Sequence, residues 1–316
     1  MNRNKNQNKI SGFADRYLER SVPAGEFIED PPDKNLKYIV VIPAFNESGL
    51  IKSLDSLFMC NDIPEGIEVI TVINSPWEAD NASSQLNQKI KEEAEEWAKL
   101  HNTGQKKFYF ILQDAPDPKN SGVGFARKTG MDEAIRRFNE RGKPDGIILS
   151  LDADVVVEKN YFQAIDTHLR KNIDTDGFNI RFEHPLDGEM DEKIYEAIAQ
   201  YELHLRYYVQ SLRHAGHPNA YHTVGSAFGV RADVYCKQGG MNKRQAGEDF
   251  YFLQKIFDLG NFSECNLTSI IPSPRPSNRV PFGTGPVVED FLKEEKELTT
   301  NHPELFEILK DFLSQT

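Results

Sequence analysis

Two carboxylates, Asp152 and Asp154, are separated by one alanine and follow an apolar run at residues 147–151. Carboxylates this close repel each other unless a cation or a proton lies between them. Oxygen ligands suit Mg²⁺ or Mn²⁺, and such an ion typically keeps coordination positions for the phosphate oxygens of a substrate. The alternative interpretation is a helix N-cap and a solvated turn, because aspartate is common in both roles. For the pair taken alone, we favour this alternative.

The apolar run before the pair is bounded by turn residues, as is typical of a short buried strand. Comparable runs at 38–42, 67–73 and 107–112 also end in polar or turn residues, with helical patterns between them. Strand, helix and strand in succession form the unit of a parallel sheet. The sequence therefore predicts a nucleotide-binding α/β half that ends near residue 155. Both aspartates would lie at the carboxyl edge of its sheet, where open α/β sheets bind ligands.

The second half of the chain has a less regular pattern. Residues 175–182 predict a strand, and residues 221–230, which contain Gly225 and Ser226, predict another. Residues 191–212 predict a long, aromatic-rich helix. Such a helix is more often part of a core than a binding surface, although some of its tyrosines are candidates for stacking on a ligand. Further helices are expected at 161–170, 231–239, 247–257, 288–298 and 303–313.

Glu248 and Asp249 follow Gly247 at the expected start of a helix. The helix dipole favours acids in a first turn, and this explains the pair most simply when it is taken alone. A carboxylate can also act as a general base that takes the proton of an attacking hydroxyl group. In combination with Asp152 and Asp154, the catalytic interpretation becomes the preferred one.

Arg275 and Arg279 lie in a stretch rich in proline and glycine at 271–286. Prolines are typical of a stiff connecting loop. Two arginines in a rigid frame could equally clamp phosphates, because a guanidinium group is suited to bidentate phosphate binding. We weigh the two interpretations evenly. The second predicts a segment that folds over a nucleotide diphosphate or a charged acceptor.

Four ordered motifs carry a resemblance to a known family: VVIPAFNE at 40–47, GVGFARK at 122–128, LSLDAD at 149–154, and GED at 247–249 after VGSAF at 224–228. Over about residues 37–260, the chain resembles glycosyltransferases with the GT-A fold, and most closely the inverting family 2 enzymes. The resemblance implies a Rossmann-like, mostly parallel α/β sheet flanked by helices, with a C-terminal helical extension. It also implies metal-dependent transfer of a sugar, with inversion, from a UDP- or GDP-sugar to an acceptor hydroxyl group.

The resemblance also assigns roles to single residues. Asp249 would be the general base, with Glu248 beside it. Asn74 stands where such enzymes usually have an aspartate, which leaves the nucleotide base open because an amide offers a donor that a carboxylate lacks. Either Arg127 or Lys128 would approach the nucleotide. Together with the two arginines above, the expected donor-binding residues are Pro43, Ala44, Asn46, Glu47, Asn74, Arg127, Lys128, Asp152, Gly225, Ser226, Arg275 and Arg279.

The same resemblance implies Mn²⁺ or Mg²⁺ as the cofactor. The ion would bridge the donor diphosphate and stabilise the negative charge that builds on it as it leaves. Asp154 would bind the ion, with Asp152 beside it. Enzymes of this fold often add a histidine, for which His222 and then His217 are the nearest candidates. A lone histidine is nevertheless more often structural than a ligand.

Composition limits the class of protein. The 316 residues include 37 basic and 49 acidic ones, a formal net charge of −12, which argues against nonspecific nucleic-acid binding. The three cysteines are far apart, which favours reduced thiols over disulfides or a zinc site. No stretch approaches a membrane span, and no apolar signal core follows the polar N-terminus. We expect a cytoplasmic protein, loosely associated with the inner membrane face if the acceptor is lipid-linked, as many acceptors of this family are.

The expected organisation is an N-terminal extension at 1–35, a glycosyltransferase domain at 36–286 and C-terminal helices at 287–316. The domain would divide into a nucleotide-binding half at 36–155 and an acceptor half at 156–286. The acceptor is left open between a lipid-linked and a small molecule.

Three other functions remain to be weighed. One is a retaining transferase of the same fold that acts on a small acid. Another is a catalytically silent binding module. Asn74 and the lack of a histidine between Asp249 and His302 leave room for it, and the retained Asp152, Asp154 and Asp249 oppose it. A sugar nucleotidyltransferase is disfavoured, because no glycine-rich loop with arginine or lysine follows the first strand.

Overall fold

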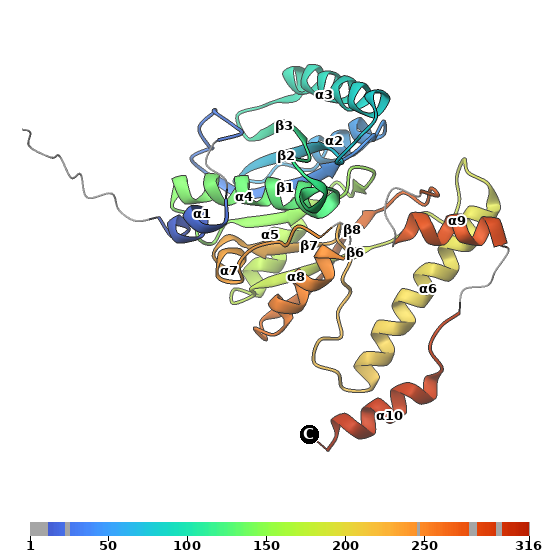
Figure 1. Cartoon of the computed structure of the whole chain (residues 1–316). Coiled ribbons are helices and arrows are strands. Elements are labelled where there is room, and N and C mark those ends of the chain that lie inside the picture. The colour runs from blue at the N-terminus through green and yellow to red at the C-terminus, as the bar shows by residue number, and fades with distance from the viewer. Residues whose placement is uncertain (1–11, 23–25, 245–246, 278–282, 295–298, 316) are drawn as a thin grey trace, which may run out of the picture.

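The structure of the chain is a computed structural model that describes residues 12–22, 26–244, 247–277, 283–294 and 299–315. In these residues eight strands form one sheet, in the order β3-β2-β1-β4-β7-β6-β8-β5 (Figure 1). The strands are β1 (Leu36–Ala44), β2 (Gly66–Ser75), β3 (Lys106–Asp114), β4 (Ile147–Ser150), β5 (Val156–Val157), β6 (Gly177–Phe182), β7 (Phe228–Arg231) and β8 (Phe262–Ile271). The α-helices are α1 (Asp15–Ser21), α2 (Leu50–Phe58), α3 (Asn81–His101), α4 (Val123–Arg141), α5 (Tyr161–Lys171), α6 (Glu192–His214), α7 (Ala232–Lys237), α8 (Glu248–Phe257), α9 (Thr284–Glu294) and α10 (Pro303–Leu313).

The sheet is parallel through β3, β2, β1 and β4, which confirms the predicted parallel half. β7 runs antiparallel to both β4 and β6, and β8 runs parallel to β6. Because β1, β2 and β4 point the same way, the residues that follow them meet at one edge of the sheet. Asp152 and Asp154 lie in the turn after β4, at the edge where the sequence places them.

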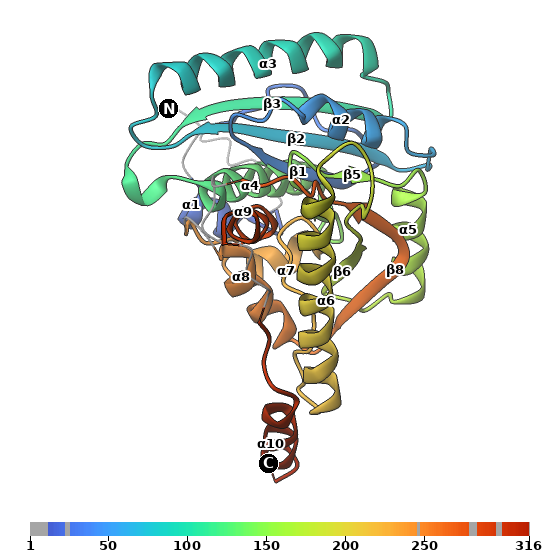
Figure 2. The same ribbon diagram turned by 90° about the vertical axis from the view of Figure 1, so that its right-hand side faces the viewer.

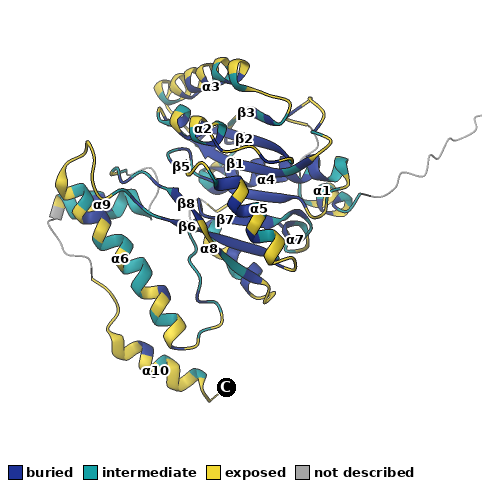
Figure 3. Ribbon diagram, turned by 180° about the vertical axis from the view of Figure 1, so that it is seen from behind, coloured by how far each residue is buried: buried dark blue, intermediate teal, exposed yellow. Residues whose placement is uncertain are grey.

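Alternate residues of β1 are buried on opposite faces of the sheet. Tyr38 and Val40 pack with residues of α2, α3 and α5, whereas Ile39 and Val41 pack with residues of α4, α7 and α8. Figure 2 shows the sheet between helices of these two sets, and Figure 3 shows its strands as largely buried. Burial on both faces explains why the strand has a continuous apolar run in the sequence instead of an alternating one.

The second half departs from the sequence prediction in several of its strands, including the short β5, which has no predicted counterpart. The strand predicted at 221–230 is wrong for its first part, because regular pairing begins only at Phe228. The residues before Phe228 follow the wall of a cavity instead. β8 has no counterpart among the predicted elements. Polar residues interrupt its apolar pattern, and its pairing with β6 is a long-range contact that no local signal reveals.

α6 projects from the sheet and carries both C-terminal helices (Figures 1 and 2). Ile198 of α6 packs with Val288 of α9 in a small, separate apolar cluster. α10 contacts α6 farther along, where the ring of Phe306 lies edge-on to Tyr207 and Tyr208. α9 therefore packs on the first part of α6, and α10 on a later part. Within the described segments, no helix has both the length and the apolar character that a membrane span requires.

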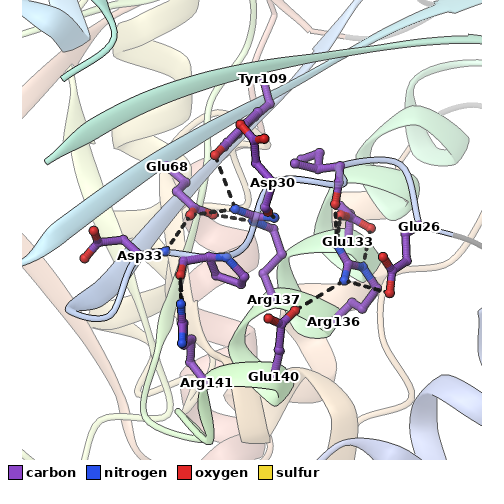
Figure 4. Close-up of polar contacts among 12 residues, drawn as sticks. Glu26, Asp30, Asp33, Glu68, Tyr109, Glu133, Arg136, Arg137, Glu140 and Arg141 are labelled. Carbon is purple, nitrogen blue, oxygen red and sulfur yellow. Dashed lines mark hydrogen bonds and ion pairs between the residues drawn. The ribbon is translucent and has the colours of Figure 1, made fainter. Parts of the chain in front are cut away.

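The segment before β1 is fastened to α4 by three arginines (Figure 4). Arg137 is fully buried and pairs with the equally buried Glu68 of β2, and its Nη1 donates to the Asp30 carbonyl at 2.9 Å. Arg136 and Arg141 donate to two further backbone carbonyls of the same segment. This part of the N-terminal extension is thus held firmly to the sheet domain.

Candidate active site

A cavity of about 830 Å³ opens at the carboxyl edge of the sheet. The ends of β1 and β2 supply Pro43, Ala44 and Asn74 to its lining, and the turn after β4 supplies Asp152 and Asp154. The volume is within the range typical of sites that hold small organic ligands. The other predicted site residues in the lining are Glu47, Arg127, His217, His222, Gly225, Ser226, Glu248, Asp249 and Arg275.

Arg127, near the start of α4, is buried and connects the two acidic motifs. Its Nη2 donates to Asp152 at 2.9 Å, and its Nε donates to Glu248 at 3.1 Å. Its Nη1 donates to the Ser150 hydroxyl group at 2.5 Å and to the Gly225 carbonyl at 3.0 Å. Burial alone would lower the pKa of Arg127, but the neighbouring carboxylates raise it above the ordinary value. The charged guanidinium therefore ties the turn after β4 to the start of α8.

Gly124, one turn before Arg127, allows α4 to approach the chain that leads into α8. A Cβ atom at this position would lie 2.1 Å from the carbonyl oxygen of Arg244 and 3.1 Å from the Cβ of Glu248. The first distance is far inside van der Waals contact, and the atom it meets belongs to the backbone. Arg127 and Glu248 can meet because residue 124 has no side chain.

Asp249 has the surroundings of a general base. A Cβ atom at residue 225 would lie 2.7 Å from its Oδ2, so the glycine there brings the backbone against the carboxylate. Burial raises the pKa of Asp249, Arg127 lowers it and Asp152 raises it, with a net increase over the ordinary value. A carboxylate with a raised pKa accepts a proton more readily near neutral pH. Burial also raises the pKa of Glu248, but its carboxylate is paired with Arg127, which leaves Asp249 as the better candidate for a base.

Arg275 contacts the acidic turn from another side. Its Nη2 donates to Oδ2 of Asp154 at 3.1 Å and also to Glu47. Its Nε has no hydrogen-bond partner in the described part of the chain. The two carboxylates create a negative potential that suits a cation, and the guanidinium group occupies this position. Arg275 is therefore placed both to neutralise this turn and to reach a ligand anion beside it.

The donor set around Asp154 fits a metal ion that is shared with a diphosphate. Mg²⁺ is commonly bound by one or two carboxylates and the phosphates of a substrate, without an all-protein cage. Across the described ranges, no three His, Cys, Asp or Glu side chains are gathered for an ion, so His222 does not join the two aspartates. Its ring lies edge-on to Phe182, with ring centres 5.1 Å apart. Burial, helped by Arg206, lowers the pKa of His222 to about 4.

Two predicted donor-binding residues in the described part of the chain are not among those that line the cavity. Lys128 points to another part of α4, where its Nζ donates to Asp132 at 2.7 Å. Asn46 donates through its side chain to the hydroxyl group of Ser83 at 3.0 Å. Arg279 lies outside the residues that the structure describes.

A second polar network at the cavity has no signal in the sequence. Nδ1 of His184 lies 2.8 Å from Oε2 of Glu202, and its Nε2 lies 3.1 Å from the hydroxyl group of Thr284. Burial raises the pKa of Glu202, but hydrogen bonds from His184 and Arg206 outweigh it and lower the pKa to about 2. The network joins the end of β6 to α6 and α9. Its members are 18 and 100 residues from His184, so only the fold reveals them.

Much of the remaining lining is apolar and comes from α6. The contributing side chains follow helical spacing and are Tyr201, Leu205, Tyr208, Val209 and Leu212. The sequence identifies this helix as aromatic-rich but leaves core and binding roles open. The choice depends on which part of α6 the other helices cover, and that is a property of the fold.

No protein-family model matches the sequence, and no curated protein matches it. Among solved structures, TarS 1–349 of S. aureus in complex with UDP-GlcNAc aligns with a TM-score of 0.52 and 14% identity, covering 88% of this chain and 72% of that one. TarS 1–349 in complex with UDP aligns at 0.46 and 12%, covering 75% and 60%. The chain spans 58% of TarS 1–349 in a third structure and 37% of a longer TarS chain. The likeness to the UDP-GlcNAc complex, together with the curled, mostly parallel sheet, shows that this chain has the GT-A type of fold.

Proposed function

We propose that the chain transfers a sugar from a nucleotide-diphosphate donor to an acceptor hydroxyl group. One observation carries the proposal: Arg127 joins Asp152 to the acidic pair at the start of α8, and the turn after β4 and Asp249 line one cavity. A UDP-sugar is the leading donor, because TarS, which shares the fold, was crystallised with UDP-GlcNAc.

The proposed reaction is a single displacement. The acceptor oxygen forms a bond to the anomeric carbon of the donor sugar while the bond from that carbon to the diphosphate oxygen breaks. The acceptor proton passes to Asp249, and the nucleoside diphosphate leaves with the electron pair of the broken bond. Because the base would lie on the face opposite to the leaving group, the configuration at the anomeric carbon would invert. Arg275 would donate to the departing phosphates, where a bidentate cation is most effective.

We further propose that Mn²⁺ or Mg²⁺ accompanies the donor. Asp154 would hold the ion directly, with Asp152 beside it, and the ion would stabilise the charge on the leaving diphosphate. Arg275 now neutralises Asp154 and Glu47. On donor binding it would exchange these carboxylates for phosphate oxygens.

Nucleotide release tests the proposal. The protein is incubated with a panel of UDP- and GDP-sugars in Mn²⁺, in Mg²⁺ or in a chelator, and the free nucleoside diphosphate is measured. The affinities for UDP and GDP are measured separately by calorimetry. We expect release from donors of one base, abolished by the chelator. Tight UDP binding without release from any donor would favour a silent binding module. Failure to bind either nucleotide would refute the proposed function.

A further inference from the structure

The lining of the cavity contains two chemically different sets of residues. At the sheet edge it carries charged groups, among them Asp152, Asp154 and Arg275. Along α6 it carries the apolar and aromatic stripe described above. A nucleotide diphosphate requires the charged groups. The stripe is therefore left for a different ligand, or for a different part of one.

The stripe faces the cavity because of what covers α6 elsewhere. In the described residues, α9 packs on the first part of the helix through Ile198 and Val288, and the stripe begins one turn later with Tyr201. Leu205 and Val209 continue it at helical spacing. These side chains thus have the composition of a core, but they border an open cavity.

The stripe and the proposed base line the same cavity. Tyr201 and Asp249 are both in the lining, and the charge of Asp249 adds to burial in raising the pKa of Tyr201. Two turns farther along α6, Tyr208 also lines the cavity; it is 41% exposed and touches the ring of Phe306 on one side. The stripe therefore forms an apolar wall along α6 that shares the cavity with Asp249.

We propose that this wall is the acceptor subsite, and that the acceptor carries its reacting hydroxyl group on an apolar body, an aryl or alkyl group. The inference rests on the proposed function and names the substrate class of its second site. The hydroxyl group would lie at Asp249 while the apolar body lies along α6 toward Tyr208. A free sugar or polyol would leave most of the wall exposed to water, whereas an apolar body would bury it.

Simple glycosides serve as probes. Methyl, butyl, octyl and phenyl β-D-glucoside, each below its critical micelle concentration, are titrated into protein saturated with UDP, and their affinities are measured by calorimetry. Each buried methylene group strengthens binding about fourfold. We expect octyl and phenyl glucoside to bind at least tenfold more tightly than methyl glucoside. A gain that grows from methyl to octyl identifies an alkyl-binding wall, and a gain confined to phenyl identifies an aryl-binding one.

Variants of α6 locate the effect. Tyr208→Ser and Leu205→Ser should remove most of the preference for apolar glucosides. The matched control is Leu203→Ser on the same helix, because Leu203 is 68% exposed and is not part of the lining. Unfolding temperature and UDP affinity are measured for each variant. Because Tyr208 is half-exposed, Tyr208→Ser should still fold and remain informative even if Leu205→Ser does not fold.

Two results would overturn the inference: equal affinity of the wild type for all the glucosides, or an equal loss of preference in Leu203→Ser. The UDP titration separates a failure of the acceptor subsite from a failure of the proposed function. Normal UDP affinity without any preference among the glucosides would refute the proposed acceptor subsite and leave the proposed function intact. A wild type that binds neither UDP nor GDP removes the proposed function.

Discussion

Two arginines hold the aspartates of the turn after β4, and they do so in different ways. Arg127 is buried, and all three of its guanidinium nitrogens donate to groups of the protein. Arg275 is partly exposed and keeps an unpartnered Nε in the described part of the chain. Arg127 therefore has a positioning role toward Asp152, whereas Arg275 is able to exchange its carboxylate partners for ligand oxygens.

Replacement of the proposed base tests its role most directly. Asp249→Asn keeps the size of the side chain but cannot accept the proton, so sugar transfer should fall by about 10²–10⁴-fold. Donor affinity should change little. Asp258→Asn, at the other end of α8 and outside the lining, is the matched control and should keep wild-type activity. Steady-state kinetics and UDP calorimetry measure both, and an active Asp249→Asn would assign the base elsewhere.

The pH dependence of transfer should follow the pKa of Asp249. Only the deprotonated carboxylate accepts a proton, so kcat/KM should fall as the pH falls through that pKa, which lies above the ordinary 3.8. Asp152 contributes to this increase. In Asp152→Asn the acid limb of the profile should therefore move to lower pH. A limb that stays in place or moves to higher pH would contradict the electrostatic link between the two residues.

Substitution of Arg275 should weaken nucleotide binding. Loss of a charged, bidentate donor costs about 1.5–3 kcal/mol, so Arg275→Ala should lower UDP affinity by about 10–100-fold. Arg275→Lys should recover only part of the loss, because lysine keeps the charge without the planar fork. Arg181→Ala, which removes an exposed arginine paired with Glu183, is the control. Calorimetry with unchanged UDP affinity in Arg275→Ala would show that the segment is only a connecting loop.

At the scale of elements, α4 supports the site from two sides. Its first turns present Arg127 to the acidic motifs. Its last turns hold the segment before β1 through Arg137 and its neighbours (Figure 4). The helix also crosses both β1 and β2, and Gly130 gives it a close approach to Val41. The position of Arg127 is thus determined by a helix that is anchored along its whole length.

This anchoring predicts a large effect on stability. Arg137→Met leaves the fully buried Glu68 without its cation and should destabilise the chain by about 3–5 kcal/mol. The double variant Arg137→Met with Glu68→Leu should recover most of the loss, because it removes the uncompensated charge. Urea unfolding measures both. Arg170→Met, which breaks an exposed pair with Asp166, serves as the control and should leave the midpoint nearly unchanged.

At the scale of the molecule, the predictable and unpredictable parts differ in the range of the interactions behind them. The parallel strands and the edge position of Asp152 follow from local apolar runs and chain order, and both are confirmed. The pairing of β8 with β6, and that of Arg127 with Glu248, join residues far apart in the chain, and no local pattern encodes them. The placement of the apolar stripe of α6 at the cavity is likewise not predictable from local patterns, because it depends on which part of α6 is covered by α9.

The absence of a side chain at Gly124 has a consequence for how easily the site could be lost. Gly124→Ala adds one methyl group that meets the backbone of Arg244 at 2.1 Å, and relief of that clash would push α8 away from α4. Circular dichroism should report an unchanged fold while Arg127 loses its hold on Glu248 and transfer falls at least tenfold. Gly104→Ala gives a comparison for the general cost of replacing a glycine, because a Cβ atom at Gly104 would meet nothing within 4 Å. The distance between α4 and α8 at the site would then be set by steric contact at residue 124. A mutation that changes no charge and no reacting atom could therefore abolish the reaction.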